Sequence, residues 1–315
     1  MKHNIKITAL LLIMFVMTQA IGMLVLYANP LQVQANINGT LQDVSNPYLE
    51  WVNPPKPETQ TEFIGVFSQL IIAFVVAIVL LFLLIKFKIA AFLKFWFFAV
   101  VSIALFLSFI AFEKLIPITF SLKAALVIAI ILSVPLAFIK IYKRNIIVHN
   151  LTELLIYPGI AVVFVPLLNL YTVIALLIAI SLYDMWAVWR SGVMQKMAKY
   201  QINNLKIFSG FFVPYLSKKV KLQLEKIRAS KSKKINEKKI KVNVAILGGG
   251  DIIFPIITAG VMFKAFGLLP AIFVIIGATL GLTYLFFFAE KKKFYPAMPF
   301  ITAGIFLGML ATLFL

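Results

Sequence analysis

The chain has 315 residues, 62% of them hydrophobic, a mean hydropathy of +1.01 and a formal net charge of +19. A water-soluble core of this size cannot bury so much apolar surface, which favours a lipid bilayer as the solvent. The chain has no cysteine, and its two histidines, His3 and His149, lie next to basic, loop-like sequence. This composition excludes thiol catalysis, cysteine metal sites, a His-Glu-x-x-His zinc protease and a Ser-His intramembrane protease. We expect no metal ion and no cofactor.

Nine apolar stretches are candidates for membrane-spanning helices, each of which needs about 20 mostly apolar residues. In chain order they cover residues 7–27, 63–85, 91–112, 119–139, 151–165, 167–189, 242–263, 266–289 and 295–315. The first is long for a signal peptide and no small-residue cleavage site follows it, so we interpret it as a retained helix. The fifth is short, and only the sequence around Pro166 separates it from the sixth. The predicted fold class is an all-α polytopic membrane protein with nine transmembrane helices.

The positions of the basic residues predict the orientation of these helices. With the N-terminus in the cytoplasm, 26 of the 30 Lys and Arg residues fall in cytoplasmic segments, and the outer segments hold only Lys56, Lys114, Lys123 and Lys264. This asymmetry follows the positive-inside rule and places the C-terminus outside. The basic residues therefore determine topology and contact lipid headgroups, and we expect no nucleic-acid partner.

The sequence indicates one membrane domain over residues 1–315. Helices one to six occupy residues 1–189, a basic cytoplasmic loop occupies 190–241, and helices seven to nine occupy 242–315. Part of the loop, residues 215–241, mixes apolar residues with lysines, which is typical either of an interfacial helix or of a disordered tether. The outer loop, residues 28–62, is rich in proline and acidic residues, and we expect it to fold against the membrane surface.

Two acidic residues lie well inside apolar stretches, Asp184 in the sixth and Asp251 in the seventh. Glu153 lies at a predicted span end beside cytoplasmic charges, where we expect it to reach water. A carboxylate inside the membrane costs about 2.5–3.5 kcal/mol and generally marks a site. Asp184 lies about 9 Å, and Asp251 about 13 Å, from the inner edge at ~1.5 Å per residue. The two carboxyl groups are therefore predicted to face each other at similar depth.

Two close carboxyl groups in a low dielectric tend to share one proton. The ionised group can take a proton from water as general base, and the neutral group can protonate a carbonyl oxygen or a leaving amine. This is the arrangement of an aspartic protease. Intramembrane acids also serve proton relays and ion sites, so a proton-coupled transporter stays open as the alternative.

Three consecutive glycines, Gly248, Gly249 and Gly250, precede Asp251 within the predicted seventh span. Glycine weakens a helix by about 1 kcal/mol per residue relative to alanine, and Pro255 adds a break one turn later. A loosened backbone would admit water and pair with an extended substrate strand. Close packing of helices is the other common reason for such glycines.

Three motifs together resemble the presenilin and signal peptide peptidase family of intramembrane aspartyl proteases. They are Tyr183-Asp184 on the sixth span, Gly248-Gly249-Gly250-Asp251 on the seventh and Pro296-Ala297-Met298 on the ninth, where the family has Pro-Ala-Leu. The resemblance implies that Asp184 and Asp251 form the catalytic dyad. It implies that the glycines shape the backbone beside the dyad, that residues 296–298 line the substrate site, and that Tyr183 packs or hydrogen-bonds nearby.

The same resemblance implies an activity and a setting. The substrates would be transmembrane helices of other proteins or signal peptides, cut near their cytoplasmic ends. The predicted orientation matches the presenilin branch of the family. The short chain is typical of a prokaryotic, archaeal homologue in the cell membrane that acts without partner subunits. A catalytically idle chaperone or scaffold for membrane proteins is a third hypothesis.

Overall fold

The computed structural model describes residues 5–37, 40–86, 90–116, 121–143, 145–190, 209–215, 243–289 and 295–314. The long helices in these ranges are α1 (Ile5–Ala28), α2 (Gln60–Lys86), α3 (Ala90–Leu115), α4 (Leu122–Phe138), α5 (Ile146–Phe164), α6 (Leu170–Met185), α9 (Gly249–Phe266), α10 (Leu268–Phe288) and α11 (Met298–Ala311). Eight helical segments of the described chain are long and apolar enough to cross a membrane, and Met298–Phe314 is a shorter apolar helix. Each predicted span corresponds to one of these helices, which confirms the fold class.

Short helical turns extend or join several of the helices. They are η1 (Pro47–Val52), η2 (Ile139–Lys143), η3 (Val165–Leu167), η4 (Trp186–Arg190) and η6 (Thr312–Phe314). The chain around Pro166, where the fifth and sixth spans meet, forms η3 and a two-residue link before α6. The sixth span therefore starts a new helix, as the sequence predicted.

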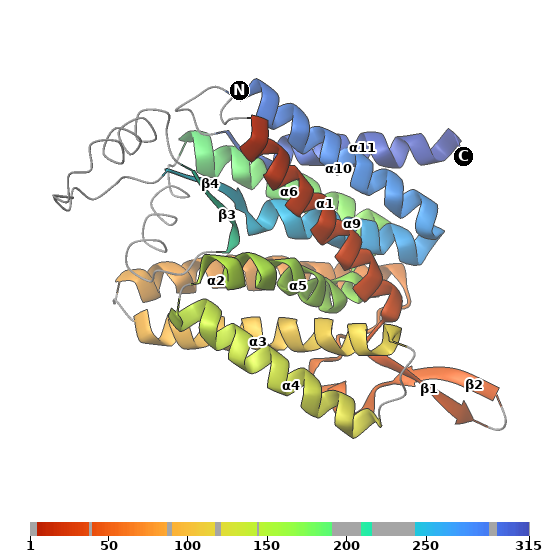
Figure 1. Cartoon of the computed structure of the whole chain (residues 1–315). Coiled ribbons are helices and arrows are strands. Elements are labelled where there is room, and N and C mark those ends of the chain that lie inside the picture. Colours follow the sequence, from red (N-terminus) through yellow and green to blue (C-terminus); the bar gives the residue numbers. More distant parts are fainter. Residues whose placement is uncertain are drawn as a thin grey trace, which may run out of the picture.

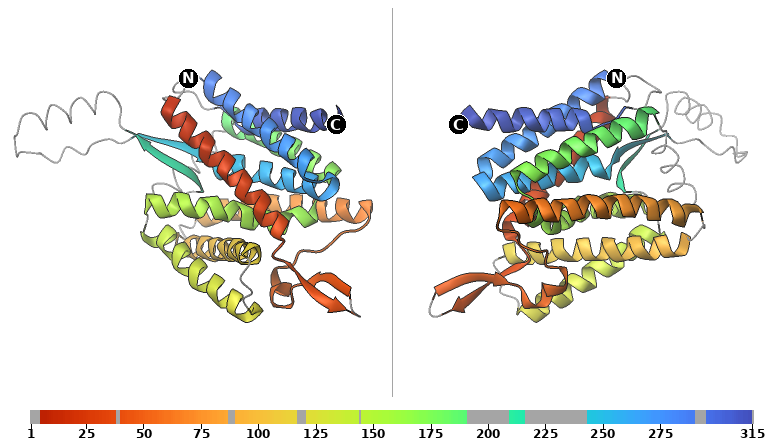
Figure 2. Two further views of the ribbon diagram at one scale, coloured as in Figure 1. Left: turned by 45° about the vertical axis from the view of Figure 1, so that its right-hand side comes forward. Right: turned by 180° about the vertical axis from the view of Figure 1, so that it is seen from behind.

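The helices pack in three tiers that Figures 1 and 2 show from several sides. At one side α3 packs on α4, and at the other α10 packs on α11. Between them α1 packs on both α5 and α9, and α6 packs on α9 and α11. α2 lies on the outer face of the bundle, where its most apolar window contains no buried residue (Figure 2). The core is therefore built around α1, α5 and α9.

Two small antiparallel sheets lie at opposite ends of the bundle (Figure 1). β1 (Gln32–Ile37) pairs with β2 (Thr40–Ser45) in the predicted outer loop. β3 (Gly210–Tyr215) pairs with β4 (Asn243–Gly248), so that Gly210 lies opposite Gly248. The second sheet brings part of the predicted basic loop against the start of α9. Residues 191–208 and 216–241 of the predicted basic loop lie outside the described part of the chain.

The seventh span differs from its predicted form, because residues 243–248 form β4 and the helix begins only at Gly249. Burial alternates along this strand, with Ala245 and Leu247 buried and Val244 and Ile246 exposed. A two-residue period is the pattern of a strand, and β-branched residues favour it. The glycines therefore form a strand-to-helix junction instead of loosening the middle of a helix.

The fifth span also begins earlier than predicted. Asn145 caps α5, since its Oδ1 accepts hydrogen bonds of 2.9 Å and 3.2 Å from the N–H groups of Ile147 and Val148. A side chain that satisfies these donors starts a helix at this point. His149 and Glu153 consequently lie on a helix and are buried. The expectations that His149 belongs to a loop and that Glu153 reaches water are wrong.

Candidate active site

Asp184 lies near the end of α6, and its carboxyl group is held at the start of α11. The side chain is buried, with the whole residue 7% exposed. The backbone N–H of Met298 donates a 3.1 Å hydrogen bond to Asp184 Oδ2, and the N–H of Ala297 also interacts with this carboxyl group. The Pro-Ala-Met segment therefore contacts Asp184 through its backbone.

The start of α11 suits this contact for two physical reasons. The first N–H groups of a helix have no partner within the helix, and the helix dipole favours negative charge there. Ala297, the N-cap of α11, has no side chain that could accept a hydrogen bond, so Asp184 supplies the acceptor. A 2.8 Å hydrogen bond from Ser181 to Thr302 joins the same two helices one turn away. The sequence analysis did not identify Ser181 or Thr302.

Asp251 is the third residue of α9 and is partly buried. Its carboxyl group interacts with the backbone N–H of Gly248, the N-cap residue of the same helix. An acidic side chain at this position commonly reaches back to the N-cap N–H and stabilises the helix start. A Cβ atom on Gly248 would lie 3.2 Å from Asp251 Oδ2, closer than ordinary contact. Glycine at position 248 therefore leaves room for the carboxyl group.

Gln19 anchors the first turns of α9 to α1. Its side chain is completely buried, and Nε2 donates a 3.0 Å hydrogen bond to the carbonyl oxygen of Ile252, the residue after Asp251. A buried amide in an apolar helix is costly without such a partner. Gln19 was not predicted as a functional residue, although a polar residue in the middle of the first apolar stretch is a visible signal.

The two aspartates lie near each other where α6 packs against α9. These helices pack against each other, and the carboxyl groups of Asp184 and Asp251 are close enough to interact electrostatically. The structure thus brings both predicted acids and residues 297 and 298 to one place at the β3–β4 end of the bundle. The ring of Tyr183 packs on Phe74 of α2 and on Trp186, with ring centroids 5.9 Å and 6.2 Å apart, and its hydroxyl group interacts electrostatically with the neighbouring Asp184.

The remaining predicted residues surround this pair in different ways. Gly249 is buried, and a Cβ atom there would lie 2.6 Å from Ser209 Oγ and 2.7 Å from the Tyr157 hydroxyl oxygen. Gly250 is exposed, and the nearest atom to its Cβ position is a Phe254 ring carbon at 3.7 Å. Pro296 is buried just before α11 begins. Gly249 therefore has a strict packing requirement that Gly250 lacks.

The site is built from carboxyl and backbone groups. Across the ranges that the structure describes, no group of three or more His, Cys, Asp and Glu side chains is arranged to hold a metal ion. Two carboxyl groups in a low-dielectric environment, with backbone donors on each, can carry out acid–base chemistry on a bound amide.

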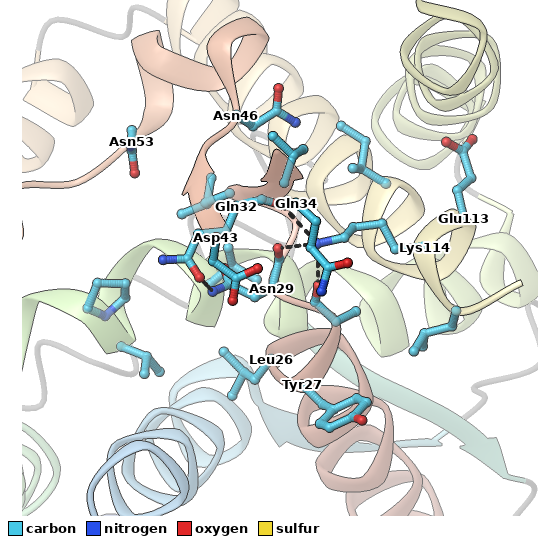
Figure 3. Close-up of a pocket in the computed structure, with 18 of the residues that line it drawn as sticks. Leu26, Tyr27, Asn29, Gln32, Gln34, Asp43, Asn46, Asn53, Glu113 and Lys114 are labelled. Carbon is cyan, nitrogen blue, oxygen red and sulfur yellow. Dashed lines mark hydrogen bonds between the residues drawn. The ribbon is translucent and has the colours of Figure 1, made fainter. Parts of the chain in front are cut away.

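A separate cavity of about 1070 Å³ lies at the opposite end of the bundle, beside β1 and β2 (Figure 3). The ammonium group of Lys114 donates three hydrogen bonds there, of 2.7, 2.8 and 2.9 Å, to the carbonyl oxygens of Ala28, Asn29 and Gln32. A cation at the C-terminal end of α1 satisfies carbonyl groups that the helix leaves open. Lys114 thus fixes the turn between α1 and β1, and the cavity is remote from both candidate acids.

A multi-pass helical bundle that brings together two aspartates, one buried and one partly buried, is the architecture of intramembrane aspartyl proteases. Comparison with known proteins agrees. The sequence pattern of the family described as "Signal-peptide peptidase, presenilin aspartyl protease" matches residues 50–315. The chain therefore belongs to this family, and the protein is an intramembrane aspartyl protease of multi-pass topology. No curated protein matches the chain significantly.

Two solved structures share the fold, both titled as a presenilin family intramembrane aspartate protease. The one in the C222 space group has a TM-score of 0.59 at 18% identity and covers 96% of this chain and 97% of its own. The one in the P2 space group has a TM-score of 0.57 at 18% identity, and the match covers 96% of this chain and 95% of the other. The likeness extends over nearly the whole length of both chains, so it covers α1, which precedes the family match.

Proposed function

We propose that Asp184 and Asp251 are the catalytic pair of this protease and that it hydrolyses peptide bonds within transmembrane helices or signal peptides. The observation that carries the proposal is the electrostatic proximity of the two carboxyl groups where α6 packs against α9, with one of them hydrogen-bonded to the start of α11. Family membership favours this activity over proton-coupled transport and over an inactive scaffold.

The proposed reaction needs one proton shared by the pair. The ionised carboxylate takes a proton from water as the water oxygen attacks the amide carbonyl carbon, and the neutral carboxyl gives its proton to the carbonyl oxygen. Collapse of the tetrahedral intermediate breaks the C–N bond, and the proton taken from water passes to the leaving amine. Each aspartate contacts a backbone N–H group, so these contacts single out neither one as the base.

The substrate helix must unwind before attack, because its own hydrogen bonds shield the peptide bond. The β3–β4 sheet offers an edge to the unwound segment. On β3, the N–H and C=O groups of Phe212 bond to the Asn150 side chain at 3.0 Å and 2.8 Å, and the Gly210 carbonyl bonds to His149 at 2.8 Å. α5 therefore covers the outer edge of β3.

Among the residues that the structure describes, none pairs with the outer edge of β4, and we propose this edge as the pairing edge. In an antiparallel pair, residues alternate between those that bond across the ladder and those that point away. Since Phe212 bonds to Asn150, its partner Ile246 directs its backbone groups away from β3. β4 runs directly into Gly248 and Asp251. A substrate strand added to this edge would lie beside the candidate dyad.

The same proposal covers the substrate-site residues, the cleavage position, the domain organisation and the cellular membrane. Gly248–Gly250 and residues 296–298 shape the substrate site, and cleavage occurs near the cytoplasmic end of the substrate helix. Residues 1–189, the loop 190–241 and residues 242–315 act as one membrane domain. The protein resides in a prokaryotic cell membrane and acts without partner subunits.

Reconstitution of the purified protein in liposomes with a transmembrane peptide tests the proposal. Mass spectrometry of the products should show cleavage by the wild type and none by Asp184→Ala or Asp251→Ala. Asp43→Asn is the matched control, because Asp43 is an exposed acid near the β1–β2 end of the bundle. Full cleavage by both alanine variants would refute the dyad, and ion-coupled solute flux without peptide products would favour transport.

A further inference from the structure

Three ionisable side chains are buried together where η2 and α5 meet near β3. Lys140, His149 and Glu153 are 7%, 8% and 1% exposed. The Lys140 ammonium forms an ion pair with Glu153 Oε1 and lies 3.3 Å from His149 Nδ1. Buried charges persist only when they are paired and hydrogen-bonded, and in membrane helices they are rare away from functional sites. The family chemistry described above uses none of these three residues.

The contacts of His149 fix its ring and connect the cluster to β3. Nε2 lies 2.8 Å from the Gly210 carbonyl oxygen, which can only accept a hydrogen bond, so Nε2 carries the proton. Nδ1 then accepts from Lys140. The neighbouring Asn150 holds Phe212 of the same strand by two hydrogen bonds. The charged cluster and Asn150 therefore lock β3 onto the first turn of α5.

Tyr157 extends this cluster towards the candidate dyad. It follows Glu153 by one helical turn on α5, is 2% exposed, and interacts electrostatically with both Glu153 and Asp251. Its hydroxyl group lies 3.3 Å from Ser209 Oγ, and the Ser209 carbonyl accepts a 3.3 Å hydrogen bond from the Gly249 N–H. Tyr157 and Ser209 thus enclose Gly249, two residues before Asp251.

We propose that Tyr157, fixed by the buried Lys140–His149–Glu153 cluster, is a positioning residue for Asp251. Its hydroxyl group contacts Ser209 and packs against the Cα of Gly249, and these contacts fix the junction between β4 and α9. Asp251 lies in the first turn of α9, directly after this junction, so a shift of the junction moves its carboxyl group relative to Asp184. Ring burial alone does not require the hydroxyl group, and this separates a positioning role from simple core packing.

The inference rests on the assignment of the dyad and is tested with the full-length protein in liposomes. Tyr157→Phe keeps the buried ring and removes only the hydroxyl. Because displacement of a catalytic group by about 1 Å costs up to about 100-fold in rate, we expect kcat to fall by about 10- to 100-fold with KM nearly unchanged. Tyr171→Phe is the matched control, since Tyr171 is 69% exposed on α6, and it should keep the wild-type kcat.

Thermal unfolding of each variant separates positioning from folding. Wild-type kcat in folded Tyr157→Phe would overturn the inference, as would a loss explained wholly by a smaller folded fraction. If Tyr157→Phe does not fold, Ser209→Ala tests the inference instead. Ser209 lies outside the helices, and the substitution removes the hydroxyl group that contacts Tyr157. A lower kcat at unchanged KM supports the inference, and wild-type kcat overturns it. Cleavage by Asp251→Ala would overturn both the dyad and this inference, whereas an inactive Asp251→Ala beside a fully active Tyr157→Phe overturns the inference alone.

Discussion

The backbone N–H of Met298 donates a 3.1 Å hydrogen bond to the carboxyl group of Asp184, 114 residues earlier in the chain. This contact explains how a Pro-Ala-Met segment can serve a carboxyl group without any polar side chain. The donor belongs to the backbone at the first residue of α11, where the helix leaves its N–H groups open. What the segment must preserve is the helix start, and the side chain at position 298 need only be apolar.

Removing this donor is expected to lower activity. Met298→Pro lacks the N–H; proline is tolerated at the first position of a helix, and it also disfavours the αR conformation of Ala297 before it. A hydrogen bond to a charged group contributes about 1.5–3 kcal/mol, so kcat should fall by roughly 10- to 100-fold. Met298→Ala is the control that loses the side chain and keeps the N–H. Met298→Leu should stay near wild type because volume and apolarity are kept. Equal kcat in the proline and alanine variants would show that the hydrogen bond is unimportant.

Gly249→Ala is expected to destabilise the protein, whereas Gly250→Ala should not. The added methyl at position 249 meets Ser209 and the Tyr157 hydroxyl at 2.6 Å and 2.7 Å, while at position 250 its nearest neighbour is 3.7 Å away. Overpacking of a buried site costs about 1–3 kcal/mol. The midpoint of thermal unfolding in detergent measures the difference. A Gly249→Ala midpoint equal to that of Gly250→Ala would contradict the tight packing of Gly249.

Lys140→Met should be strongly destabilising, because it leaves Glu153 buried without its cation. Removal of one partner of a buried ion pair typically costs about 3–5 kcal/mol. Lys143→Met is the control, since Lys143 lies on the same turn, η2, and is exposed. Unfolding in detergent at increasing denaturant concentration compares the two. Similar midpoints for the two variants would mean that the ion pair contributes little to folding.

Gly304→Ala should weaken the contact between α10 and α11. Gly277 and Gly304 lie so close that a Cβ atom on either one collides with the backbone of the other helix. Small residues allow such close approach in membranes, and the expected cost is about 1–3 kcal/mol. Gly65→Ala on α2 is the control, because nothing lies within 4 Å of its Cβ position. Thermal unfolding in detergent checks the order of the two variants.

Hydropathy was sufficient to place the nine long helices of the described ranges, since lipid requires long apolar stretches whatever their partners are. It could not separate residues 243–248 from the helix that follows. A short apolar run is compatible with a strand and with a helix. Only its pairing with β3, some 30 residues earlier, decides between the two. The three glycines lie at the boundary between β4 and α9, whereas the sequence-based prediction placed them in the middle of a membrane-spanning helix.

The candidate dyad was accessible from sequence because carboxylates inside apolar stretches are conspicuous. The burial of Glu153 could not be predicted from the sequence. Its partner, Lys140, belongs to a different helical segment and resembled the other cytoplasmic basic residues that determine topology. Gln19 carries no charge and was passed over for that reason. The spacing Gly277-x-x-x-Gly281, together with Gly304-x-x-x-Gly308, was a readable signal for the α10–α11 contact that the sequence analysis did not use.

The shortness of α11 has a consequence for the surrounding lipid. Together with η6, the described helical segment Met298–Phe314 spans about 26 Å, less than the ~30 Å thickness of a typical hydrocarbon core. Such a mismatch is relieved by local thinning of the bilayer. The first residue of α11, Met298, is hydrogen-bonded to Asp184. Headgroups and solvent should therefore lie closer to the candidate dyad on this side of the bundle. Membranes of shorter acyl chains, which already match this helix, should therefore favour turnover over membranes of longer ones.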